Sequence, residues 1–175
     1  MSNELELFLL TGSNLGNRVM NLQAAMAKLS TWLGQPAQVS SIYETAAWGK
    51  TNQNAFLNQM LLFKTSYEAD KILAEILSIE KELGRVRHEK WGARFIDIDI
   101  IYYGDQIIDQ PQLKIPHPHL QDRRFTLVPL AEISPLQKHP QLLKNSLELL
   151  AACTDDLPVK IFRQDSKPRP LEQSS

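Results

Sequence analysis

Two aspartates that alternate with isoleucines over residues 96–100 are the side chains in this sequence best suited to chemistry. Successive side chains of a strand point to opposite faces, so the isoleucines can fill a core while Asp97 and Asp99 share the other face. Carboxylates held about 7 Å apart repel each other unless a cation intervenes. Mg²⁺ suits such a pair, because it binds through one or two carboxylates and takes its remaining ligands from phosphates and water. The alternative is an antiparallel strand with one solvated face. However, Asp is uncommon in strands, and we expect this strand to be central, so two aspartates in it favour metal binding.

A basic segment, residues 85–94, directly precedes this strand and forms a candidate anion site. Its chemically active side chains are Arg85, Arg87, His88, Lys90, Trp91 and Arg94. Arginine offers a planar fork for phosphate oxygens, and carboxylates that hold Mg²⁺ beside several cations are the groups that phosphoryl transfer requires. A solvated basic loop is the alternative. The indole ring argues against it, since that ring can stack on a nucleotide base.

Polar residues on either side of this segment are further candidates. Glu80 lies in the last turn of a predicted helix, where the helix dipole disfavours an anion. It could pair with an arginine, bind a nucleotide hydroxyl or be solvated. His117 lies between prolines and could donate to a phosphate. Together with His119 it could instead bind zinc, but no third ligand stands nearby in the sequence.

The spacing of apolar residues predicts the elements that must position these groups. Expected strands are Leu5–Thr11, Val39–Thr45, Phe56–Thr65, Phe95–Tyr103, a short hairpin through Ile107 and Ile108, and Val159–Phe162. Expected helices are Val19–Leu33, a helix that begins at a Thr65/Glu68 capping box and ends at Gly84, and Gln141–Ala152. This order predicts an α+β fold with a ferredoxin-like βαββαβ core, in which helices pack on one face of an antiparallel sheet. The proline-rich last third is expected to add irregular loops and the final helix.

The composition limits the kinds of partner. The 175 residues suit one domain, expected over residues 1–163, with a polar C-terminal tail over residues 164–175. Nineteen Lys and Arg against 20 Asp and Glu leave a net charge of −1, which provides no overall field to attract nucleic acid or anionic lipid. The single cysteine, the polar N-terminus and the lack of a long apolar run predict a cytoplasmic protein. We also expect a monomer that binds small molecules.

These segments together resemble the 6-hydroxymethyl-7,8-dihydropterin pyrophosphokinase family of folate biosynthesis over about residues 7–133. The motifs that carry the resemblance are Gly12–Gly16, Phe56–Asn58, Glu80 with Gly84–Arg87, Trp91–Arg94 followed by Asp97–Ile100, Pro116–His117 and Arg123–Phe125. The basic segment that runs into Asp97–Asp99 is the most specific of them. The sequence departs from the family pattern at Ala46, Ala47, Phe56, Ala93 and Pro118.

The resemblance implies that a pyrophosphoryl group passes from ATP to the hydroxymethyl oxygen of the pterin, with release of AMP. It implies two Mg²⁺ ions on Asp97 and Asp99. The implied catalytic residues are Arg85, Arg94, Asp97 and Asp99. The implied ATP-binding residues are Glu80, Arg87, Trp91, Arg94, Ile100, His117 and Arg123. The implied pterin-binding residues are Thr45, Ala46, Trp48, Phe56, Asn58, Asp97 and Phe125.

Other functions explain fewer of these residues. Another Mg²⁺-dependent nucleotidyl or phosphoryl transferase on a ferredoxin-like fold would share the two aspartates, but it gives no reason for Phe56, Asn58 and Phe125. An RNA-binding sheet would carry exposed aromatic residues and a basic face, whereas the corresponding strand here carries two carboxylates. A small-molecule regulatory domain is a weaker alternative.

Overall fold

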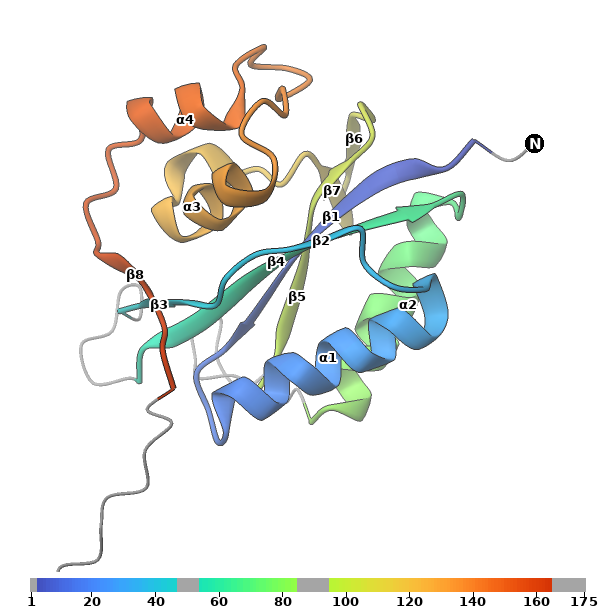
Figure 1. Ribbon diagram of the computed structural model, residues 1–175. Helices are drawn as coiled ribbons and strands as arrows, with labels where there is room; N and C mark the ends of the chain where they lie inside the picture. Colours follow the sequence, from blue (N-terminus) through green and yellow to red (C-terminus); the bar gives the residue numbers. More distant parts are fainter. Residues whose placement is uncertain (1–2, 47–53, 85–94, 165–175) are drawn as a thin grey trace, which may run out of the picture.

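A computed structural model of the chain describes residues 3–46, 54–84 and 95–164 (Figure 1). Its strands are β1 (Leu5–Ser13), β2 (Gln38–Val39), β3 (Tyr43–Thr45), β4 (Phe56–Thr65), β5 (Asp97–Tyr103), β6 (Ile108–Gln110), β7 (Leu113–Ile115) and β8 (Val159–Ile161). Its helices are α1 (Arg18–Leu33), α2 (Ala69–Glu82), α3 (Arg124–Ile133) and α4 (Ser146–Ala152), and a 3₁₀ turn spans Leu120–Asp122. Among the described helices, none is both long and apolar enough to cross a bilayer.

One antiparallel sheet forms the centre of the molecule. Its strand order is β5-β1-β4-β3-β8, β2 adds to β4, and β6 and β7 form a separate hairpin. The two longest strands, β1 and β4, pair along their whole length, from Leu5 opposite Thr65 to Ser13 opposite Leu57. The expected α+β class with an antiparallel sheet is therefore confirmed. However, β5 lies at one end of the strand order, so the expectation that the two aspartates lie on a central strand is wrong.

Helices cover both faces of the sheet, which corrects the expectation that they cover one. Helices α1 and α2 lie on one face and α3 and α4 on the other (Figure 1). The reason lies in β1, where Leu7 and Leu9 are buried against α1 and α2 while Phe8 and Leu10 are buried on the opposite side. A strand that is apolar on both faces needs a layer on each side to remove it from water.

A β-bulge in β5 sets which face its residues occupy. Leu9 pairs with Ile100 but Phe8 pairs with Tyr102, so β5 has one extra residue at this point. Towards its beginning, β5 follows the predicted alternation: Ile98 and Ile100, like Ile96 directly before the strand, are buried in the core under α1 and α2. Asp99 lies opposite Leu10, whose side chain is on the α3 face. Both aspartates therefore face the α3 side of the sheet.

Local boundaries differ from the prediction where a side chain bonds to the backbone. The Thr65/Glu68 capping box is wrong, because Thr65 Oγ1 accepts a hydrogen bond from the Tyr67 amide and the Glu68 side chain makes no capping bond. The predicted strand 39–45 is two strands, since Ser40 uses its hydroxyl to accept a hydrogen bond from the Met60 amide.

The C-terminal third is more regular than its prolines predict. Helix α3 was not expected, and the helix predicted from residue 141 begins only at Ser146, after an Asn145/Glu148 capping box. Ile108 pairs with Ile115 in the β6–β7 hairpin, so the turn at residues 104–105 does not fold the chain back onto β5. The predicted last strand ends one residue earlier, at Ile161.

Candidate active site

A row of residues across the sheet brings the predicted substrate side chains together. Residues directly opposite each other in antiparallel strands share a face, and Asn58 pairs with Gly12, which in turn pairs with Asp97. Phe56 lies two residues before Asn58 on the same strand and therefore shares its face. Thr45 pairs with Phe56 across β3 and β4. The sheet thus places on its α3 side four residues that lie far apart in the sequence.

The two aspartates are half-buried, and Asp99 acts on a basic residue of the α3 side. Arg123 precedes α3, and the negative charge of Asp99 acts on its guanidinium. Burial lowers the pKa of Arg123 below its ordinary value, while the charges of Asp99 and Asp122 act in the opposite direction. An arginine remains charged throughout the physiological range, so anionic and cationic groups meet at this point of the molecule.

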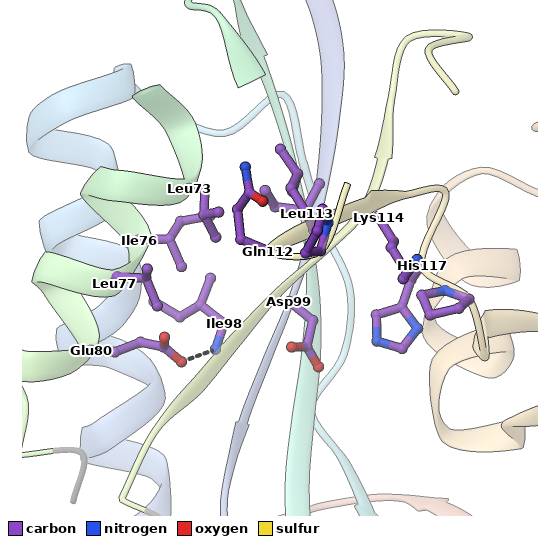
Figure 2. Close-up of a pocket in the computed structure, with 13 residues that line it drawn as sticks. Leu73, Ile76, Leu77, Glu80, Ile98, Asp99, Gln112, Leu113, Lys114 and His117 are labelled. Atoms are coloured by element: carbon purple, nitrogen blue, oxygen red, sulfur yellow. Dashed lines mark hydrogen bonds between the residues drawn. The ribbon is translucent and has the colours of Figure 1, made fainter. Parts of the chain in front are cut away.

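A pocket of about 290 Å³ opens beside β5, between α2 and the β6–β7 hairpin (Figure 2). One wall is apolar and consists of Leu73, Ile76 and Leu77 from α2. Figure 2 shows Asp99 between the Glu80 side and the His117 side of this pocket. An apolar slot that ends at the Asp99 carboxylate can bury a flat ring and direct an attached charged group toward that carboxylate.

Glu80 is a structural part of the pocket and is almost fully buried, so a solvated Glu80 is ruled out. Its Oε2 accepts a hydrogen bond of 3.0 Å from the Ile98 amide (Figure 2). That amide belongs to the edge of β5, where an unpaired donor would be unfavourable. Glu80 therefore joins α2 to the strand that carries the two aspartates.

His117 is held at the other side of the pocket as a neutral imidazole. Its amide donates to the Ile101 carbonyl of β5, and its Nδ1 accepts from the His119 amide, so Nε2 carries the proton. Burial lowers the pKa of His117 to about 4, and the charges of Arg123 and His119 add to this effect. Within the described residues no group of three or more potential metal-ligating side chains occurs, so the histidine pair gains no third ligand there.

The α3 side of the sheet holds a polar amide and two aromatic rings. Asn58 is buried, and its Nδ2 donates to the Thr11 carbonyl at 3.3 Å. A Cβ atom at Gly12 would lie 2.6 Å from the same Nδ2, so only glycine leaves room for this amide. Phe125 lies in the first turn of α3, with its ring centre 5.7 Å from the Arg123 guanidinium carbon. The hydroxyl oxygen of Thr45 is buried and has no hydrogen-bond partner among the described residues.

Comparison with known proteins decides the family. The profile of 7,8-dihydro-6-hydroxymethylpterin-pyrophosphokinase (HPPK) matches residues 8–135. The chain belongs to the HPPK family. Among curated relatives, the 2-amino-4-hydroxy-6-hydroxymethyldihydropteridine pyrophosphokinase of Aquifex aeolicus is 45% identical over 74% of this chain and 80% of its own length. The enzyme of the same name from Bacillus subtilis is 38% identical over 91% of both chains.

Solved structures agree on the fold of the HPPK family. The crystal structure of Plasmodium falciparum HPPK-DHPS A437G with SDX-DHP matches with a TM-score of 0.71 and 18% sequence identity. The match covers 87% of this chain and 46% of that chain, so this chain spans about half the length of the longer protein. The wild-type HPPK-DHPS structure matches with a TM-score of 0.69.

Some residues that the HPPK resemblance implies cannot be placed here. Trp48, Arg85, Arg87, Trp91 and Arg94 lie outside the described residues. Ala46 is exposed at the end of β3, and Ile100 is buried and lines the pocket from the α2 side. The described part of the chain thus holds both aspartates and most of the residues implied for the two substrates.

Sequence reasoning missed several residues that line the pocket. Leu73 and Leu77 lie four residues apart on α2, and Glu80 follows three residues later. That spacing is a second helical stripe beside the core stripe and could have indicated a wall of the site. Gln112 and Lys114 also line the pocket. They come from the β6–β7 hairpin, whose pairing gave no clear sequence signal.

Proposed function

We propose that this chain transfers a pyrophosphoryl group from ATP to the hydroxymethyl oxygen of 6-hydroxymethyl-7,8-dihydropterin, releasing AMP, as a step of folate biosynthesis. The observation that carries the proposal is the shared face of Asn58, Asp97 and Asp99, which joins a ring-reading amide to two carboxylates next to a pocket. In this reaction an oxygen–phosphorus bond forms at the β-phosphorus of ATP. The bond from that phosphorus to the oxygen of the α-phosphate breaks, and AMP leaves.

The two aspartates fit Mg²⁺, and we assign two ions to Asp97 and Asp99. A site with only two protein carboxylates suits an ion that keeps waters and takes substrate phosphates as ligands, and the described residues contain no larger cluster of metal-ligating side chains. When bound, Mg²⁺ would neutralise the phosphate oxygens and align them. The buried isoleucines that alternate with the aspartates fix the strand and therefore the spacing of the two carboxylates.

We assign the pocket beside β5 to ATP. The apolar wall of α2 and Ile100 suit the flat base, Glu80 lies at the β5 edge of the slot, and neutral His117 can donate from Nε2 to a phosphate. Arg123 adds a positive charge on the Asp99 side. The family resemblance adds Arg87, Trp91 and Arg94 to this list, and it gives Arg85 and Arg94 catalytic roles.

We assign the α3 side of the sheet to the pterin. The rings of Phe56 and Phe125 suit the two faces of a flat heterocycle, because aromatic contact favours stacked planes. With one N–H of the Asn58 amide used on Thr11, its Oδ1 and second N–H can pair with the polar edge of the ring. The buried, unpaired hydroxyl of Thr45 supports a polar contact on the same side, and the resemblance adds Ala46, Trp48 and Asp97.

The arrangement of the molecule supports the finer fold assignment. The order β5-β1-β4-β3, with α1 and α2 on one face, corresponds to the ferredoxin-like βαββαβ plan, to which α3, α4 and β8 are added. We further propose one domain over residues 1–163, a monomer in solution, and a cytoplasmic location with small-molecule substrates only.

The identity of the nucleotide released from ATP tests this function. With Mg²⁺, ATP and the hydroxymethyl dihydropterin, purified protein should release AMP in step with pterin diphosphate, and chelation of Mg²⁺ by EDTA should stop turnover. ADP as the product would favour another phosphoryl transferase, and AMP release without the pterin would contradict the proposal.

Substitution of the aspartates tests the site. Asp97→Asn and Asp99→Asn remove one negative charge each with little change in volume, so we expect turnover to fall by at least about 10²-fold with an unchanged melting temperature. Asp105→Asn is the matched control, because Asp105 is exposed in the turn that follows the same strand. Full activity of both variants would remove the assignment of the ions to these carboxylates.

A further inference from the structure

The first residue of α1, Arg18, makes an unusual set of contacts. One guanidinium nitrogen, Nη1, donates to Glu44 Oε2 at 2.7 Å and to the Ala55 carbonyl at 2.8 Å. Arg18 follows the helix cap Asn17, at the end of the helix where the dipole disfavours a positive charge. The stability of α1 therefore does not explain an arginine here. The arginine is explained by its two hydrogen-bond partners, which come from β3 and from the residue directly before β4.

Both partners of Arg18 lie at the end of the β3–β4 ladder. Glu44 is the middle residue of β3 and pairs with Leu57. Ala55 directly precedes Phe56, the first residue of β4. One guanidinium thus holds the two strands at the point where Thr45 lies opposite Phe56.

The turn between β1 and α1 makes a second attachment to the same point. Asn14 is fully buried, and its Nδ2 donates to the Asn54 carbonyl at 3.3 Å, while Asn54 Nδ2 donates to the Asn14 carbonyl at 3.5 Å. The two residues before Phe56 are therefore both held: Asn54 by the turn after β1 and Ala55 by the first residue of α1. That turn continues from β1, the strand that carries Gly12 beside Asn58.

A third element closes around the guanidinium. The Arg18 guanidinium carbon lies 5.5 Å from the centre of the Phe162 ring, directly after β8. β8 pairs with β3, with Lys160 opposite Glu44. The Arg18 side chain is 24% exposed and that of Glu44 is 39% exposed, so the guanidinium is partly shielded from solvent while the carboxylate stays accessible.

We propose that Arg18 is a positioning residue for the pterin side of the site. It fixes the start of β4 and so holds Phe56 and Asn58 in register with Thr45 and with the aspartates of β5. The inference rests on the proposed function. Loss of these bonds lets the ring-binding residues move, and small displacements of substrate-positioning groups weaken binding strongly. The ATP pocket lies beside β5, on the other side of β1 and β4, and should be little affected.

Separate Michaelis constants for the two substrates test the inference. In Arg18→Ala we expect the KM for the pterin to rise on the order of tenfold, the scale of a lost charge-assisted hydrogen bond, with the KM for ATP changed less than about twofold. Lys28→Ala is the matched control. Lys28 also lies on α1 and also makes a 2.7 Å ion pair, but with Glu82 of α2, so this ion pair joins α1 to α2 and not to β3 or β4.

Comparing the KM for the pterin with the KM for ATP in these variants separates a positioning role of Arg18 from a general loss of stability. Equal rises in both Michaelis constants, or no rise in either, would overturn the inference. If Arg18→Ala does not fold, Glu44→Gln removes only the charge of the partner carboxylate and should still raise the pterin KM selectively. Arg18→Lys, which keeps the charge but not the planar fork, should recover part of the loss. Failure of the wild-type protein to form AMP would contradict the proposed function, whereas an active wild type with an unaltered Arg18→Ala contradicts only the role of Arg18.

Discussion

At the scale of single residues, the environment of His117 determines its charge. Its imidazole is partly buried and feels the charge of Arg123, and its Nδ1 is already used as an acceptor. A neutral histidine can donate one hydrogen bond to a phosphate without adding a further cation next to Arg123. The same burial links the protonation of His117 to the stability of the fold.

The pH dependence of stability tests this state of His117. Because the folded-state pKa of about 4 lies below the ordinary value of 6.5, protonation favours the unfolded chain. Stability from this group is complete above about pH 6.5 and is lost as the pH falls toward 4. We expect His117→Gln to reduce the loss of unfolding free energy between pH 7 and pH 5 by about 1 kcal/mol, as measured by urea denaturation. An identical pH dependence in both proteins would contradict the enclosed, neutral histidine.

Gly12 supports a second prediction at the residue scale. A methyl group at this position would meet Asn58 Nδ2 at 2.6 Å and would force the amide away from the Thr11 carbonyl. Gly12→Ala should therefore raise the KM for the pterin by on the order of tenfold. The effect should vanish in an Asn58→Ala background, where no amide remains to be displaced. A full additional loss in the double variant would show that Gly12 acts by another route.

At the scale of elements, α3 is joined to the sheet by one carboxylate. Glu132 Oε1 accepts from the Ser41 amide at 2.6 Å, and Oε2 accepts a short hydrogen bond from the Tyr43 hydroxyl. The same helix carries Phe125 in its first turn, while β3 continues to Thr45. This contact therefore fixes the distance between the two sides of the proposed pterin slot.

Glu132 and Tyr43 should be coupled in stability. Burial first, and then the bond to Glu132, raise the pKa of Tyr43 to about 12. The contribution of the pair is thus fully present below pH 10 and is lost as the pH rises toward 12. At pH 7 we expect Tyr43→Phe and Glu132→Gln each to lower the unfolding free energy by about 1–2 kcal/mol, and the double variant by less than their sum. Additive losses in urea denaturation would show that the two side chains are not coupled.

The helices illustrate what local sequence can predict. The stripes of α1 and α2 follow a helical period and end near glycines, so local information was sufficient. Helix α3 contains Pro129, which lacks an amide donor and argues against a helix interior. It forms because Leu127 and Leu130 are fully buried against the second face of the sheet. That burial depends on tertiary packing, which a local pattern does not contain.

At the scale of the whole molecule, the C-terminal strand joins the last described residues to the site. β8 pairs with β3, the Phe162 amide donates to the Ile42 carbonyl, and the Phe162 ring packs on the core under α1 and α2. The residues after 164 are polar in sequence and were expected to form a tail.

Two shortened chains test whether β8 and Phe162, and not the residues after 164, stabilise the sheet. Ending the chain after residue 164 should leave the melting temperature and the pterin KM unchanged. Ending it after residue 158 removes β8 and Phe162, and we expect the melting temperature to fall by roughly 4–8 °C, as for a loss of about 2 kcal/mol in a chain of this size. Equal melting temperatures for the two shortened chains would show that β8 does not stabilise the sheet.

The sequence alone determined the shared face of Asp97 and Asp99, because the alternation of a strand is a local property. It also determined α1, α2 and the long strands β1 and β4, whose apolar patterns are complete within each segment. The tertiary structure decided that β5 lies at the end of the strand order, that Glu80 is buried against it, and that Arg18 reaches β3 and β4. These contacts depend on strand order and on how helices cross the sheet, which bring together residues with no periodic relation in the sequence.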